Sequence, residues 1–93
     1  HYLTAGTPPA ADVRLVIEVS DTTLWNDRTV KARLYAGAGI PEYWVIDITG
    51  RQIFVHRNPL NGMYQLVTVH LETESISPLT APQATVLIST LLP

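Results

Sequence analysis

The sequence predicts a small α/β domain in which a helix connects two parallel strands of a mixed β-sheet and a β-meander follows. The prediction depends on a β-branched run at residues 13–20, a helical pattern at residues 24–38, and three further strand patterns separated by turns. A β-α-β crossover between neighbouring strands of one sheet is almost always parallel and right-handed. The 93 residues allow one small core, which excludes a two-domain enzyme.

The N-terminal part of the chain combines a leader with the first strand. Because Pro8 and Pro9 disfavour a helix, we expect an extended leader over residues 1–11 and a single, partial domain over residues 12–93. The run VRLVIEVS then alternates its side chains between the two faces of a strand. One face carries Val13, Leu15, Ile17 and Val19, and the other carries Arg14, Val16, Glu18 and Ser20.

The helix at residues 24–38 follows three cap-type side chains at residues 21–23. Its apolar spacing lets four residues share one side, as is typical of a helix that packs on a core: Leu24, Val30, Leu34 and Ala38. Gly37 and Gly39 bracket its expected C-terminus. Aromatic residues in and after it are spaced as core or core-edge residues: Trp25, Tyr35, Tyr43, Trp44 and Phe54.

The second half of the chain predicts strands and a closing segment. The apolar run YWVIDI at residues 43–48 is typical of a central strand that is covered on both faces. Strands at residues 52–57 and 64–71 follow after turns and complete a meander. The apolar tail predicts one short closing helix or turn, with Val86, Leu87, Leu91 and Leu92. Parallel pairing brings Glu18 and Asp47 near the same edge of the sheet, where open α/β sheets place ligands.

The composition excludes several functional classes. Hydrophobic residues make up 46% and charged residues 15%, which is typical of a soluble globular domain and not of a disordered tail or a membrane span. The absence of cysteine excludes disulfides, a thiolate nucleophile and a cysteine zinc site, and fits a cytoplasmic location. The net charge of −2 taken alone argues against DNA binding.

Glu18 and Lys31 are the main candidates for chemistry. A carboxylate in an apolar strand needs water, an ion pair or a metal ion, and the long Lys31 side chain can reach it from the helix. The alternative is structural, because Asp27 lies four residues before Lys31 and can form an exposed helical ion pair with it. Arg28 and Arg33 add positive charge that fits either DNA binding or a solvated helix face.

A family resemblance is carried by three stretches: Asp12 to Ser20, Leu24 to Lys31, and Leu34 to Asp47 with its segment GIPEYWVID. They closely resemble the Uma-type putative restriction endonuclease family of the PD-(D/E)XK nuclease superfamily. The resemblance implies a restriction-endonuclease-like fold in which an Asp and a Glu hold Mg²⁺ and a Lys orients or activates the attacking water. Glu18 and Lys31 fall on the Glu and Lys positions, and Ser20 stands where an E-x-K motif has its lysine.

The resemblance also implies a missing ligand. The metal-binding Asp of the family lies in a strand upstream of Glu18, and this chain, which we expect to lack the N-terminal part, has only the leader there. Asp12 lies six strand residues from Glu18, or about 20 Å. Asp21 points to the opposite face if the strand continues, and Asp47 is a possible neighbour.

The resulting hypothesis is a Mg²⁺-dependent endonuclease that hydrolyses DNA phosphodiester bonds and is inactive or weak as this chain. Its catalytic residues are Glu18 and Lys31, its metal ligand is Glu18, and Arg28 and Arg33 contact DNA. The alternative is a non-catalytic nuclease-fold module that binds a protein or a nucleic acid. We further expect no membrane association and a possible homodimer, because a truncated sheet exposes an edge strand.

Overall fold

Within residues 9–93, which this computed structural model describes, the main sheet has four strands in the order β1-β2-β3-β4. The strands are β1 (Leu15–Ser20), β2 (Glu42–Asp47), β3 (Gln52–Leu60) and β4 (Met63–Leu71). β1 pairs with β2 in parallel, whereas β2 with β3 and β3 with β4 are antiparallel. The predicted crossover and the predicted meander are therefore confirmed.

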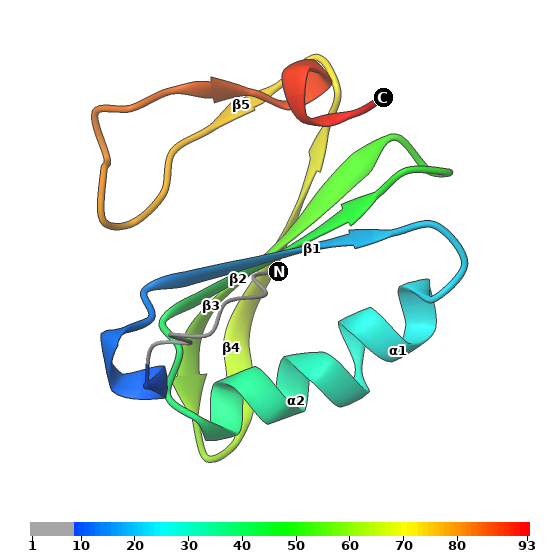
Figure 1. Cartoon of the computed structure of the whole chain (residues 1–93). Helices are drawn as coiled ribbons and strands as arrows, with labels where there is room; N and C mark the ends of the chain where they lie inside the picture. Colours follow the sequence, from blue (N-terminus) through cyan, green and yellow to red (C-terminus); the bar gives the residue numbers. More distant parts are fainter. Residues whose placement is uncertain (1–8) are drawn as a thin grey trace.

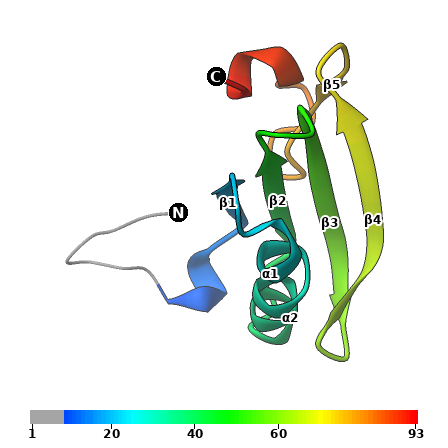
Figure 2. The ribbon, with the colours of Figure 1, turned by 90° about the vertical axis from the view of Figure 1, so that its right-hand side faces the viewer.

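The crossover connection contains a helix that is interrupted once. It consists of α1 (Leu24–Arg28) and α2 (Val30–Gly37), which lie along one face of the sheet (Figure 1; Figure 2). Thr29, with φ −115° and ψ −75°, separates them. The helix ends as predicted, because Gly39 adopts φ +76° and the Ile40 N–H donates to the Tyr35 carbonyl, 3.1 Å away.

The side of the helix that faces the sheet differs from the prediction. The buried helix residues are Asp27, Ala32 and Ala36, whereas Leu34 is 65% exposed and Val30 is also exposed. The predicted apolar side was therefore wrong for Val30, Leu34 and Ala38, whereas Leu24 packs against the core as predicted. The strands present large side chains to the helix, such as Tyr43 and Phe54, and the buried positions of α2 hold alanine.

The aromatic prediction was wrong for one residue. Trp25, expected in the core or at its edge, is 73% exposed on α1, whereas Trp44 is 2% exposed. The other three predicted aromatic residues lie in or against the core. The core on the helix side contains Val13, Val16, Ala32, Ile40, Tyr43, Val45 and Phe54.

The C-terminal segment covers the opposite face of the sheet (Figure 1). It contains β5 (Ser75–Ile76), β6 (Val86–Leu87) and the 3₁₀ helix η2 (Ile88–Leu91), which confirms the predicted short closing helix. Its apolar residues join a second core of Trp44, Ile46, Ile53, Val55, Ile76, Ile88 and Leu92. Every residue of β2 is buried, as predicted for a strand covered on both faces.

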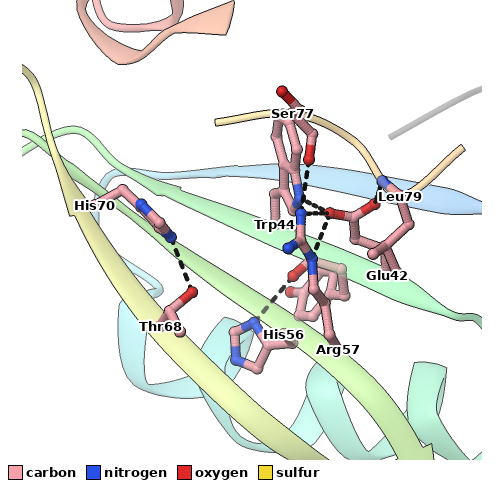
Figure 3. A network of polar contacts seen from close by, with 9 residues as sticks. Glu42, Trp44, His56, Arg57, Thr68, His70, Ser77 and Leu79 are labelled. Atoms are coloured by element: carbon pink, nitrogen blue, oxygen red, sulfur yellow. Dashed lines mark hydrogen bonds and ion pairs between the residues drawn. The ribbon is translucent and has the colours of Figure 1, made fainter. Parts of the chain in front are cut away.

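A buried charge network fastens this segment to the sheet (Figure 3). Oε2 of Glu42 accepts hydrogen bonds from Trp44 Nε1 at 2.7 Å and from Arg57 Nη2 at 2.8 Å. Its Oε1 accepts from the Leu79 N–H at 2.9 Å, and Arg57 Nη2 also donates to the Ser77 carbonyl at 2.7 Å. Because both carboxylate oxygens are satisfied, Glu42 is stable in the interior.

Some boundaries differ from the sequence expectations. Ala10–Asp12 form a 3₁₀ helix, η1, so the extended conformation expected for the leader is wrong there, and residues 1–8 lie outside the described part. β3 continues to Leu60 because Asn58 adopts a positive φ of 59° within the strand, which leaves a shorter turn than predicted. In the part of the chain that the structure describes, no helix is long and apolar enough to cross a membrane.

Candidate active site

Glu18 lies on the helix-facing side of β1 and is 8% exposed. The alternation predicted for this strand holds, because Val16 and Ser20 are buried on the same side. The Tyr35 hydroxyl of α2 donates a hydrogen bond to Glu18 Oε2 at 2.8 Å. The carboxylate is therefore held between the strand and the helix that follows it in the chain.

Lys31 brings its ammonium to the same place from α2. Lys31 Nζ lies 3.6 Å from Glu18 Oε2 and 3.1 Å from Asp27 Oδ1. The hydrogen bond with Asp27 raises the pKa of Lys31, burial opposes the rise, and the charge of Glu18 adds to it. Lys31 is therefore a protonated cation at neutral pH, shared between two carboxylates.

Asp27 is more buried than the sequence suggested. The predicted Asp27 to Lys31 pair is present, but Asp27 is 1% exposed, so the expectation of an exposed pair was wrong. Burial alone would raise the pKa of Asp27, but hydrogen bonds from Thr23 and Lys31, with a further contribution from Ser20, outweigh it and lower the pKa. The Thr23 hydroxyl donates to Oδ2 at 2.7 Å. Asp27 is therefore a stable, ionised partner of Lys31.

Ser20 and Asp47 lie side by side at the carboxyl ends of β1 and β2. Ser20, which occupies the lysine position of an E-x-K motif, is buried next to Asp27. Asp47 is committed to the turn after β2, where its oxygens accept from the Gly50 N–H and from Gln52 Nε2, each at 3.0 Å. Asp47 therefore has a structural role, and Asp27 is the second carboxylate beside Lys31.

The implied metal, Mg²⁺, is usually bound by one or two carboxylates together with water. Glu18 can supply one carboxylate, although its Oε2 already accepts from Tyr35. The Asp27 oxygens are engaged by Thr23 and Lys31. Within residues 9–93, no group of three or more His, Cys, Asp or Glu side chains is placed to hold a metal ion. The described residues therefore do not by themselves make up a metal site, and Glu18 is the carboxylate among them that could contribute one ligand.

Comparison with known proteins places the chain in a family. The family model Uma2, described as "Putative restriction endonuclease", matches residues 3–89. The chain belongs to the Uma2 family. No curated protein matches it. Family membership suggests a nuclease function, and the mixed sheet with its crossover helix and meander is restriction-endonuclease-like.

The Uma2 chain thus brings Glu18 and Lys31 together, as the sequence led us to expect, and leaves Arg28 and Arg33 on the other flank of the helix. Arg28 lies over the Phe54 ring, with Cζ 3.8 Å from the ring centroid. Sequence reasoning missed Tyr35, the hydrogen-bond donor to Glu18. One sequence feature could have identified Tyr35 as a site residue. It lies four residues after Lys31, so the two side chains share one face of the helix.

Proposed function

We propose that this Uma2 chain forms the catalytic region of a Mg²⁺-dependent endonuclease of the PD-(D/E)XK type, which hydrolyses DNA phosphodiester bonds in the cytoplasm. The observation that supports the proposal is the meeting of Glu18 from β1 with the Lys31 ammonium from α2, at 3.6 Å. Phosphodiester hydrolysis develops negative charge around phosphorus, and a cation fixed beside a metal-binding carboxylate can stabilise it.

The two residues have different roles in this proposal. Glu18 is one ligand of the metal, which when bound supplies Lewis-acid stabilisation of the phosphate. Lys31 orients the attacking water and stabilises developing negative charge as an ammonium, because its raised pKa makes it a poor general base at neutral pH. Asp27 and Tyr35 are positioning residues, since they hold the Lys31 ammonium and the Glu18 carboxylate in place.

Nicking of supercoiled plasmid DNA tests this proposal with high sensitivity, because one cut changes the plasmid's form. We expect at most weak cleavage by this chain, dependent on Mg²⁺, since the nearby carboxylates already have partners. Glu18 contacts Tyr35 and Lys31, Asp27 contacts Lys31, and Asp47 is held in a turn. Any cleavage should be lost in Glu18→Gln and Lys31→Met and kept in Glu74→Gln, a matched surface control. Cleavage that persists in Glu18→Gln would contradict the assignment.

A non-catalytic binding module is the second candidate function. It is favoured by the neutralisation of Lys31 by two carboxylates, which a purely structural ion pair also explains. Calorimetric titration with Mg²⁺ and Mn²⁺ separates the two functions. Metal uptake that disappears in Glu18→Gln supports the nuclease, and no heat of binding in the wild-type chain supports the module.

A homodimer is also part of the proposal. β4 is an edge strand with the sequence MYQLVTVHL, which contains no charged residue, no proline and no glycine. Natural edge strands usually carry such residues because they block pairing with another chain. Antiparallel pairing of two β4 strands about Val67 would place Met63 opposite Leu71 and would oppose no like charges. We therefore propose that two copies pair through β4.

A further inference from the structure

The flank of the helix opposite Glu18 carries a pocket of about 210 Å³. Arg28, Thr29 and Arg33 line it from the helices, while His56 and Tyr64 line it from β3 and β4. One water molecule occupies about 30 Å³ of liquid, so the space is sufficient for a small anion with its hydration. The pocket opens to solvent between the helices and β4, and it does not include Glu18 or Lys31.

The pocket concentrates positive charge that has no acidic partner. Among the described residues, ion pairs engage Lys31, Arg51 and Arg57, whereas neither Arg28 nor Arg33 forms one. Arg28 is held in place by stacking on the Phe54 ring. Two guanidinium groups that line one pocket without a carboxylate are suited to bind a phosphate, because their planar forks match its oxygens.

An exposed aromatic side chain extends the same surface. Trp25 lines shallow hollows on α1 and α2 together with Arg28 in one and Arg33 in another. Its indole is 73% exposed, which is unusual for the largest apolar side chain in a small domain. A positively charged groove beside an aromatic face is a common arrangement in proteins that bind single-stranded nucleic acids.

We propose that the pocket between Arg28 and Arg33 binds a backbone phosphate of DNA, with the Trp25 indole against the adjoining nucleotide. This inference deepens the proposed nuclease function and rests on it for the identity of the ligand. It assigns the strand a place on the flank of the helix opposite Glu18. Binding at this pocket requires no metal ion.

The two tryptophans allow a direct test. Trp44 is buried and hydrogen-bonded to Glu42, so quenching of tryptophan fluorescence by a polar ligand reports on Trp25. The protein is titrated with a short DNA duplex and, separately, with inorganic phosphate, at low salt and with a chelator present. We expect the duplex to quench Trp25 fluorescence. Arg28→Gln and Arg33→Gln should each weaken duplex binding by about tenfold, the effect of one lost charge-assisted contact.

Arg14→Gln is the matched control, because Arg14 is an exposed arginine on the β1 side and outside the pocket. This variant should keep a duplex affinity within about twofold of the wild type. An equal loss of affinity in all three variants would contradict binding at the pocket. Arg33→Gln keeps the test valid if Arg28→Gln unfolds, since Arg33 is exposed. Binding of inorganic phosphate without binding of the duplex would overturn the assignment to DNA.

The duplex-binding test can fail or succeed independently of the cleavage test of the catalytic proposal. Glu18→Gln should bind the metal-free duplex with wild-type affinity and yet lose cleavage. A duplex that binds normally to Arg28→Gln and Arg33→Gln would refute the pocket and leave the roles of Glu18 and Lys31 to the nicking assay.

Discussion

At the scale of single residues, the site depends on a lysine that comes from a helix instead of a strand. Lys31 reaches Glu18 with its long side chain from α2, which packs on the sheet through Ala32 and Ala36. Ser20 fills the place that a strand lysine would take and lies next to Asp27. The position of the ammonium therefore depends on helix packing as well as on the sequence spacing.

His56 is the residue whose titration should affect stability. It is buried on β3, and its Nδ1 lies 3.0 Å from the Tyr43 carbonyl. Burial lowers the pKa of His56 below its usual 6.5, the hydrogen bond to Tyr43 opposes this, and the positive charge of Arg28 adds to it. The other groups that face it are Tyr64, whose ring centroid is 5.6 Å away, and Arg33 across the pocket.

The unfolded chain therefore binds a proton at His56 at a higher pH than the folded chain does. The free energy of unfolding should fall as the pH decreases from about 8, through 6.5, to about 5, because protonation favours the unfolded state. Urea denaturation at a series of pH values measures this dependence. His56→Gln should remove most of the decline, whereas His70→Gln should keep it. A wild-type chain with constant stability over this range would contradict the prediction.

At the scale of elements, the strands were predictable and the orientation of the helix was not. Alternation with a period of two and β-branched composition identify β1 to β4, because each strand is tied to a sheet face. The apolar spacing of the helix pointed to Val30 and Leu34 as its inner side, and both are exposed. Sequence patterns report hydrophobicity, whereas burial in the structure depends on shape, and Ala32 fits in the core beside Tyr43 and Phe54.

The candidate site was also predictable only in part, because the sequence does not show the orientation of the helix. Glu18 and Lys31 could be identified from the sequence, because the strand pattern and the family resemblance both pointed to them. The burial of Asp27 and the hydrogen bond from Tyr35 depend on the rotation of the helix about its axis, which the sequence pattern gave incorrectly. Asp27 was therefore expected in solvent, although it lies in the interior.

Paired substitutions on the helix test its observed orientation. Leu34→Gln should change the free energy of unfolding by less than about 0.5 kcal/mol, because the side chain is largely in solvent. Ala36→Leu should reduce it by about 1–3 kcal/mol, because the added atoms have no space against the sheet. Urea denaturation measures both. A large cost for Leu34→Gln with little for Ala36→Leu would indicate the originally predicted orientation.

At the scale of the whole molecule, the sheet is covered by the helices on one face and by the C-terminal segment on the other, and β1 and β4 lie at its edges. The two covers differ in how they are held. The helices pack through alanines and the Lys31 ion pairs, whereas the C-terminal segment is fastened by the Glu42 to Arg57 network. Neither cover extends over the exposed apolar residues of β4, which include Val67, Val69 and Leu71.

Light scattering on the whole protein tests the proposed pairing through β4. The wild-type chain should show a dimeric mass that increases with concentration, and Val67→Lys should give a monomer because two like charges would face each other. Val19→Lys is the matched control, since Val19 is also an exposed valine but lies on the β1 edge. A wild-type monomer at high concentration, or a dimer lost only in Val19→Lys, would exclude β4 as the interface.

The shared position of Lys31 has a consequence for how a charged polymer would orient on the molecule. Its ammonium offsets one of the two carboxylates it contacts, so that flank of the helix keeps a net negative charge. The opposite flank presents Arg28 and Arg33 without an acidic partner in the described chain. The helix therefore separates a negative pole from a positive one, and this local dipole would turn an approaching polyanion towards the arginines before any contact forms.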